Sequence, residues 1–253
     1  MKSHAKINAF LKILGQDERS YHLLSSRFVL IDDLYDELYF VKDKQNEGFE
    51  IITDFVCKDN IINKAYAALS NKGFKNELEE FFKTYSLKLV KNIPVFAGLG
   101  GGSSNCATFL NMLNESLNLK LSTDELIKLS ISLGSDVAFF LSGFKSANVG
   151  GCGEIISEFS DDIPKIRLKF TEVKCDTNLV YKEFDRLNLA SKPDKNTIAL
   201  YETLSTRELF GFENKILNDL FTPCVSLYPK MQEFMSAGYF LSGSGGTVFE
   251  VIL

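Results

Sequence analysis

Residues 94–105 read Pro-Val-Phe-Ala-Gly-Leu-Gly-Gly-Gly-Ser-Ser-Asn, and an apolar stretch at helical spacing follows at once. Four of the first nine residues are glycine, and glycine loses more backbone entropy on folding than any other residue. Such a loop is useful where the backbone turns tightly and brings its N–H groups close to a ligand. Ser103 and Ser104 are good N-cap residues for the helix that follows. A glycine-rich loop that opens a helix presents bare N–H groups and the positive end of the helix dipole, which suits an anion, above all phosphate.

Two common nucleotide-binding motifs do not match this loop. No Gly-Lys-Ser/Thr closes it, as a P-loop requires. The dinucleotide-binding motif needs a different glycine spacing and an acidic residue further on. Phosphate binding is the interpretation we favour, and a flexible turn before a core helix is the alternative.

Composition narrows the class of protein. The chain has 253 residues, of which 45% are hydrophobic and 24% charged, as is usual for a soluble globular protein with one large or two moderate domains. The formal net charge is −5, and no basic stripe is present, which argues against a nucleic-acid partner. No run reaches the roughly 18–20 apolar residues of a membrane span. The first residues are polar and charged rather than a signal-peptide core, so we expect a cytoplasmic protein.

The cysteines indicate reduced thiols. There are 5 of them, an odd number, and no pair has the spacing of metal ligands, so we do not expect a zinc site. Cys106 lies one turn into the helix after the glycine loop, where we expect a small core residue rather than a reactive thiol.

The N-terminal segment alternates in polarity. Ala5, Ile7, Ala9, Leu11 and Ile13 share one face, as in a strand with one buried side. Lys6 and Asn8 project together from the other face. A lysine on such a face is usually solvated, so this residue alone indicates little.

Further elements follow from local patterns. We expect strands at 28–31 and 37–41 around an Asp32-Asp33 turn, a helix at 60–69 and a strand at 87–90. A capping box at 122–125 opens a helix that closes at Gly134, and Asp136 is a candidate N-cap for 137–141. After a second glycine cluster at 150–153 we expect strands at 166–170 and near Val173, and helices at 178–187 and 213–220. A final hairpin carries Ser242-Gly243-Ser244-Gly245-Gly246-Thr247 in its turn.

This mixed order of strands and helices predicts an α+β fold in both halves. We place an N-terminal domain at residues 1–149 and a C-terminal domain at 150–253, with the last strand a candidate to return to the N-terminal domain. The sequence ends within that strand, so we expect no C-terminal tail beyond it.

Three motifs in this order resemble those of the GHMP kinases: Lys6/Asn8, the loop at 98–104, and the turn at 242–247. Tyr21-His22 and Gly134-Ser135-Asp136 resemble the corresponding motifs of one GHMP kinase subfamily. The members of that subfamily phosphorylate a hydroxyl of a cytidine-diphosphate-linked polyol, in the non-mevalonate route to isoprenoids. The resemblance runs from about residue 4 to the end. It implies a two-domain fold, with an ATP-binding N-terminal domain, a smaller ferredoxin-like C-terminal domain, and the substrate in the cleft between them.

The resemblance also implies roles for single residues. Asp136 would be the general base and would also touch the substrate, with Lys6 as its catalytic partner and Asn8 on the polyol. Tyr21 and His22 would read the cytosine, with Tyr181 as a second aromatic wall and Thr177 nearby. Asn60 and Lys91 would lie around the adenosine. The ATP phosphates would be held by the loop residues, which are Pro94, Val95, Phe96, Ala97, Gly98, Leu99, Gly100, Gly101, Gly102, Ser103 and Ser104.

The chemistry of phosphoryl transfer agrees with these roles. An alcohol is a poor nucleophile at neutral pH, so a carboxylate that takes its proton is useful. A nearby lysine favours the ionised carboxylate and offsets charge on the transferred group. The cofactors implied are ATP and Mg²⁺, which normally bridges the phosphate oxygens. Ser103 and Ser104 are both candidate hydroxyl ligands for the metal, and the sequence does not choose between them.

Structural roles remain as alternatives for three of these residues. Asp136 could be only a helix cap, His22 could have a structural role, and Tyr181 could be a core aromatic. Two departures from the family pattern also stand out. Ser20 replaces the usual glycine before Tyr-His, from which we expect a different turn. Phe96 lies in Val-Phe-Ala where Met-Gly-Gly is usual, from which we expect a narrower nucleotide site.

Other functions are compatible with parts of the pattern. A GHMP kinase for mevalonate or homoserine would not need a Tyr-His pair, because those substrates carry no base. A catalytically inactive ligand sensor would not need to keep both Lys6 and Asp136. An RNA-binding module conflicts with the acidic pI of about 5.3.

Overall fold

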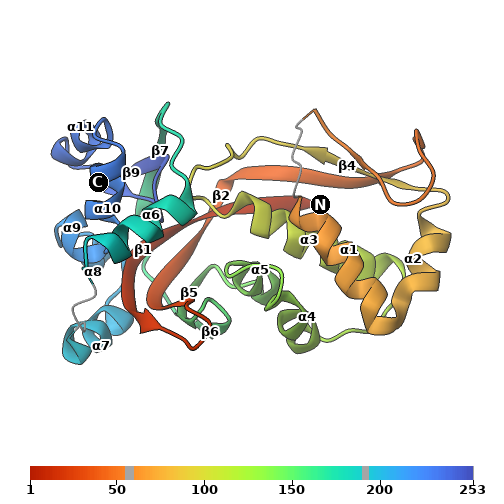
Figure 1. Cartoon of the computed structure of the whole chain (residues 1–253), viewed down its shortest axis with the longest axis horizontal. Coiled ribbons are helices and arrows are strands. Elements are labelled where there is room, and N and C mark those ends of the chain that lie inside the picture. The colour runs from red at the N-terminus through yellow and green to blue at the C-terminus, as the bar shows by residue number, and fades with distance from the viewer. Residues whose placement is uncertain (55–59, 190–193, 253) are drawn as a thin grey trace. The chain divides into compact units, whose positions relative to one another are not determined.

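The computed structural model describes residues 1–54, 60–189 and 194–252 (Figure 1). By its internal contacts the chain forms two units. Unit 1 comprises residues 1–5, 31–94 and 101–143, and unit 2 comprises residues 6–30, 95–100 and 144–253. These units divide the chain differently from the domain boundary predicted at 149/150, which stays a prediction.

Two long strands, β1 (Lys2–Gln16) and β2 (His22–Val41), run through both units and pair with each other. In unit 2 the first part of β2 pairs antiparallel with β5 (Ser146–Gly151), and β5 pairs with β6 (Ile155–Glu158). In unit 1 the second part of β2 pairs antiparallel with β4 (Ser86–Val90), and the short β3 (Ile51–Ile52) lies parallel to β4.

The strand β2 corrects the prediction of two strands around an Asp32-Asp33 turn. Its backbone is continuous, and both aspartates are exposed. No glycine or proline interrupts the segment, so the extended backbone continues and the two charges stay in solvent. The second glycine cluster, residues 150–153, forms the end of β5 and the turn into β6.

The helices of unit 1 share one core. They are α1 (Ile61–Leu69), α2 (Lys75–Phe81) after the kinked segment η1 (Ser70–Phe74), α3 (Gly101–Ser116), α4 (Thr123–Ser130) and α5 (Val137–Ser142). Apolar residues of α1 and α3, including Ile62 and Phe109, pack with Leu38 of β2. The capping box of Ser122 and Glu125 is confirmed, although α4 ends at Ser130 rather than Gly134.

The start of α3 differs from the prediction. The helix begins at Gly101, so Ser103 and Ser104 lie within its first turn and are not N-caps. Cys106 is fully buried, and this burial raises the pKa of its thiol to about 12. The prediction of a core residue at this position is therefore confirmed.

Unit 2 contains a three-stranded antiparallel sheet in the order β7-β9-β8, formed by Lys165–Phe170, Thr247–Ile252 and Phe240–Leu241. Its helices are α6 (Thr177–Arg186), α7 (Lys195–Thr203), α8 (Thr206–Leu209), α9 (Asn214–Leu217), α10 (Phe221–Leu227) and α11 (Met231–Ser236). Side chains of α6, α10 and α11 form one core with Leu241 and Val248 of the sheet. The final hairpin is confirmed, and the last strand pairs with β7 and β8.

One predicted element of this unit is wrong, and another is too long. No strand forms near Val173, whose backbone N–H instead bonds the Thr171 hydroxyl at 3.2 Å. The helix predicted at 213–220 stops at Leu217, because Asn218 is extended and bridges to Leu11 of β1. The α+β fold itself is confirmed. Within the described residues, no helix is long and apolar enough to cross a membrane.

Candidate active site

The two glycine-rich segments that are far apart in the sequence meet within unit 2. The Ser242 hydroxyl donates a hydrogen bond to the Gly98 carbonyl at 3.0 Å. A Cβ on Gly98 would overlap the Ser242 carbonyl oxygen, and a Cβ on Gly246 would overlap the Phe96 carbonyl oxygen. Both glycines also have positive φ, 71° and 87°. Glycine is therefore required at these two positions by the close approach of the backbones.

Strand β1 fixes the loop at its other side. The Lys6 backbone N–H donates to the Leu99 carbonyl at 2.9 Å. The Lys6 ammonium donates to Asn8 Oδ1 at 2.7 Å and lies 4.2 Å from the centre of the Phe28 ring. Asn8 in turn donates to the Ser26 hydroxyl at 2.9 Å. The structure thus brings Lys6, Asn8 and the glycine loop together.

The polar face of β1 is not solvated. Lys6 and Asn8 are only 4% and 3% exposed, which corrects the expectation of one buried side. Burial of a charged group is costly unless polar partners compensate it. Asn8 Oδ1 is one such partner of the Lys6 ammonium, and the catalytic role of Lys6 stays a prediction.

The first turn of α3 contains two glycines in different surroundings. A Cβ on Gly101 would lie 2.9 Å from Ile93 Cγ2, whereas a Cβ on Gly102 would find Ile61 Cγ2 at 3.9 Å as its nearest neighbour. Packing explains the glycine at 101 but not at 102, which is exposed. The Ser104 hydroxyl is buried and accepts a hydrogen bond from Ser3 at 2.7 Å, while Ser103 is half-buried.

A buried aspartate that the sequence analysis missed anchors the approach to the loop. Asp36 is fully buried, and its carboxylate accepts from the backbone N–H groups of Asn92 and Ile93 at 2.7 and 2.8 Å. It also accepts from Lys91 Nζ at 2.5 Å and Asn105 Nδ2 at 2.8 Å. Polar residues on a strand carry no pattern that reveals such a network. Lys91 therefore has a structural ion pair, and its contact with adenosine stays a prediction.

Asn60 and Asp136 occupy helix starts in unit 1. Asn60 caps α1, with its side-chain oxygen accepting from the Ile62 N–H at 3.0 Å. Asp136 precedes α5, but its side chain makes no capping hydrogen bond to that helix. Helix capping therefore does not account for the aspartate at 136. Because Asp136 belongs to unit 1 and Lys6 to unit 2, their pairing stays a prediction.

A tight turn presents Tyr21. The Asp17 carboxylate accepts from the backbone N–H groups of Tyr21 and Arg19, each at 2.9 Å. The bond from Tyr21 is the largest cause that lowers the pKa of Asp17. Ser20 within the turn has φ 64°, and the Tyr21 ring beyond it is 60% exposed.

His22 and Tyr181 are neighbours in unit 2, and their contact with a cytosine stays a prediction. Their ring centres are 4.9 Å apart at an angle of 38°, and the edge of Phe184 meets the imidazole at 6.0 Å. His22 Nε2 lies 2.8 Å from Asp185 Oδ1 of α6. At the start of α6, the Thr177 hydroxyl lies 2.7 Å from the Ser244 hydroxyl. This contact links the helix to the glycine-rich turn at residues 242–247.

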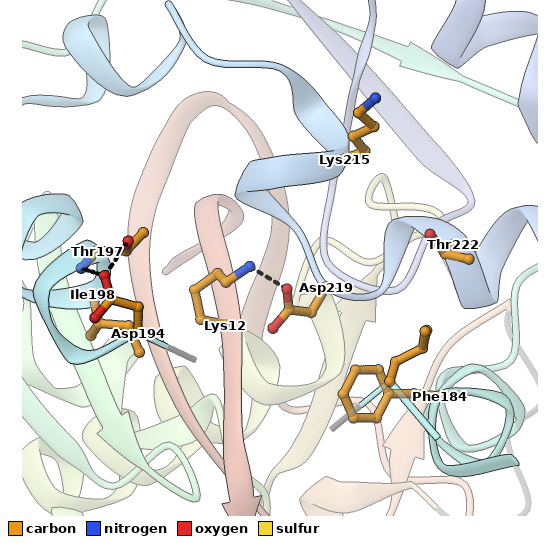
Figure 2. Close-up of a pocket in the computed structure, with 9 residues that line it drawn as sticks. Lys12, Phe184, Asp194, Thr197, Ile198, Lys215, Asp219 and Thr222 are labelled. Atoms are coloured by element: carbon orange, nitrogen blue, oxygen red, sulfur yellow. Dashed lines mark hydrogen bonds and ion pairs between the residues drawn. The ribbon is translucent and has the colours of Figure 1, made fainter. Parts of the chain in front are cut away.

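Unit 2 also contains a cavity of 260 Å³ (Figure 2). Its lining includes the ion pair of Lys12 and Asp219, which Figure 2 marks with a dashed line, and the Phe184 side chain. None of the predicted site residues lines it. We therefore do not assign the cavity to the site of the predicted reaction.

Comparison with known proteins agrees with this arrangement. The family model "GHMP kinases N terminal domain" matches residues 60–144. Over 99% of both chains, the sequence is 58% identical to 4-diphosphocytidyl-2-C-methyl-D-erythritol kinase of Campylobacter jejuni subsp. jejuni serotype O:6. The chain belongs to the 4-diphosphocytidyl-2-C-methyl-D-erythritol kinase family.

Two further members of this kinase family show how far the similarity extends. The chain is 40% identical to the kinase of Sulfurimonas denitrificans, over 99% of this chain and 96% of the relative. A crystal structure of 4-(cytidine 5'-diphospho)-2C-methyl-D-erythritol kinase superposes with a TM-score of 0.74 at 29% identity, over 99% of this chain and 89% of that one. The GHMP kinase fold is thereby established for the whole chain.

Proposed function

We propose that this protein uses ATP to phosphorylate the 2-hydroxyl of 4-diphosphocytidyl-2-C-methyl-D-erythritol, in the non-mevalonate synthesis of isoprenoid precursors. The observation that carries this proposal is the full-length identity of 58% to a kinase named for that substrate. The clustering of Lys6, Asn8 and Leu99 of the glycine loop within unit 2 supports it. Both substrates are soluble nucleotides, and we place the reaction in the cytoplasm.

We propose that residues 94–104 hold the ATP phosphates, with Asn60 and Lys91 near the adenosine. The support is the backbone geometry. Glycines with positive φ at 98 and 100 lead directly into the N-terminus of α3, where free N–H groups and the helix dipole favour an anion. The spare room around Gly102 is what close approach of a phosphate would require.

For the chemical step, Asp136 acts as the general base on the hydroxyl, and Lys6 is its catalytic partner. A carboxylate accepts the proton as the oxygen attacks, and an ammonium lowers the energy of the charge that develops. Asn8, which accepts a hydrogen bond from Lys6 at 2.7 Å, holds the Lys6 side chain and contacts the polyol.

Mg²⁺ is the proposed metal, and it neutralises phosphate charge when bound. Among the described residues, no group of three or more His, Cys, Asp or Glu side chains could hold a metal ion. This fits Mg²⁺, which is commonly bound through substrate phosphates and few protein ligands. Since the Ser104 hydroxyl is already bonded to Ser3, Ser103 is the better candidate for a protein hydroxyl ligand.

For the cytidine end, Tyr21 offers an exposed ring for stacking, and His22 reads the base edge. Tyr181 packs against His22 and forms the second wall, with Thr177 nearby at the start of α6. An exposed tyrosine beside a partly buried histidine matches what a flat base with a polar edge requires.

The test is ATP turnover across a panel that contains the cytidine-diphosphate polyol, mevalonate and homoserine. We expect turnover with the first substrate alone. Turnover with mevalonate or homoserine but not the cytidine substrate would identify a GHMP kinase for another alcohol. Binding of the cytidine substrate without any turnover would instead identify a non-catalytic sensor.

A further inference from the structure

We propose that Asp185 is a positioning residue that sets the tautomer of His22, and that cytosine is selected over uracil through the other ring nitrogen. This inference rests on the proposed function. The observation behind it is the distance of 2.8 Å between His22 Nε2 and Asp185 Oδ1.

A carboxylate can only accept a hydrogen bond, so the facing Nε2 must carry the proton. Gln16 Nε2 also lies 3.2 Å from His22 Nε2, but the shorter contact to a charged oxygen decides the tautomer. Gln16 then contributes through its hydrogen bond to the same Asp185 oxygen at 3.3 Å. In the neutral imidazole, Nδ1 is consequently an acceptor.

The orientation of the ring is fixed as firmly as its tautomer. Tyr181 lies against one face of the imidazole, and Phe184 meets it edge-on. Both residues come from α6, which also supplies Asp185. The His22 side chain is 14% exposed, and Nδ1 has no hydrogen-bond partner among the described residues. One helix therefore supplies the contact at Nε2 and two aromatic contacts to the ring, and leaves Nδ1 for a ligand.

An acceptor at Nδ1 distinguishes the two pyrimidines. Cytosine carries an amino donor at position 4, whereas uracil, like thymine, carries a carbonyl acceptor there. Nδ1 accepts a hydrogen bond from the first and faces a lone pair on the second. A site that hydrogen-bonds a substrate N–H rejects the analogue that lacks it.

The experiment combines a spectroscopic and a kinetic measurement on Asp185→Ala and Asp185→Asn. Two-bond ¹H–¹⁵N correlations report the tautomer directly, and the chain has only 2 histidines. His4, in unit 1 beside Tyr35, serves as the internal reference. The kinetic measurement is the ratio of kcat/KM for the cytidine-diphosphate polyol to that for its uridine counterpart.

We expect Nε2–H at His22 in the wild type and a changed tautomer population in Asp185→Ala. The cytidine-to-uridine ratio should fall on the order of 10-fold, the effect of losing one hydrogen bond. KM for the cytidine substrate should rise while KM for ATP stays constant. Asp185→Asn should retain part of the effect, because its amide oxygen can still accept from Nε2.

Asp162→Ala is the matched control, because it removes an exposed carboxylate of the same unit that pairs with Arg207. It should leave both readouts unchanged. An Nδ1–H tautomer in the wild type would overturn the inference. So would an Asp185→Ala variant with unchanged tautomer or unchanged ratio. If the wild type does not turn over the cytidine substrate, the proposed function fails, whereas the tautomer measurement still decides the role of Asp185.

Discussion

Ser20 and Phe96 are among the residues that hold a backbone conformation that normally belongs to glycine. Ser20 has φ 64° and Phe96 has φ 55°. A left-handed conformation costs roughly 1–2 kcal/mol for an L-residue with a side chain. Both residues stand where the family pattern has glycine. The sequence suggests a different turn at Ser20, but the backbone keeps a conformation that glycine adopts readily. The Phe96 side chain is 60% exposed, so no packing compensates its strain.

Glycine at these positions should therefore raise stability. For Phe96→Gly and Ser20→Gly we expect the free energy of unfolding to rise by up to about 1 kcal/mol, since relief of strain is partly offset by a more flexible unfolded chain. Asn188→Gly is the comparison, because Asn188 also has positive φ, 52°, but asparagine tolerates it better. Urea unfolding of the three variants should give the smallest gain for Asn188. A loss of stability in Phe96→Gly would contradict the argument.

Tyr21 tests the cytosine site at the level of a single ring. Stacking of a base on an aromatic side chain contributes about 1–3 kcal/mol, so Tyr21→Ala should raise KM for the cytidine substrate by roughly 5- to 150-fold. Because the ring is 60% exposed, the melting temperature should hardly change. Tyr21→Phe should behave like the wild type. Equal weakening for ATP and the cytidine substrate, with a large loss of stability, would show that the residue serves only the turn.

At the scale of elements, the sequence predicted correctly those helix caps and turns that depend only on residues close together in the sequence. The capping box of Ser122 and Glu125 and the hairpin around 242–247 depend on neighbours in sequence, and both are confirmed. The second buried face of β1 and the network around Asp36 depend on residues far away in sequence. Polarity alternation cannot reveal that a polar face is covered, and an aspartate within a strand does not disclose its partners. The burial of Lys6 and the ion pair of Lys91 could therefore be found only from the structure.

Substitutions in the first turn of α3 can distinguish an effect on packing from an effect on ligand binding. Gly102→Ala has room for its methyl group and replaces a poor helix former with the best one, which favours stability by roughly 1 kcal/mol. If this turn holds phosphate, the same methyl group should obstruct it and weaken ATP binding. Gly101→Ala, whose Cβ would press on Ile93, should instead lose stability. Calorimetry that finds unchanged ATP affinity in Gly102→Ala would remove Gly102 from the phosphate site.

At the scale of the whole molecule, the predicted reaction needs residues from distant parts of the chain. The glycine loop passes from unit 1 at Pro94 into unit 2 at Val95 and back at Gly101. The motif order in the sequence predicted these participants because each motif is local. How the fold holds each one, such as Gly98 against Ser242, is a tertiary property that no motif encodes.

The decisive prediction at this scale concerns Asp136, whose position before α5 is not explained by capping. Asp136→Asn keeps the size of the side chain but removes its ability to accept the proton. We expect kcat to fall by roughly 10²–10⁴, the usual contribution of a general base, while ATP affinity and the melting temperature stay close to wild type. Asp124→Asn, a change of the same kind in the first turn of α4, should retain activity and serves as the control. Steady-state turnover together with ATP calorimetry separates the outcomes. Wild-type turnover in Asp136→Asn would end the assignment of the base, whereas a loss of ATP affinity without a loss of kcat would move this residue from the chemical step to nucleotide binding.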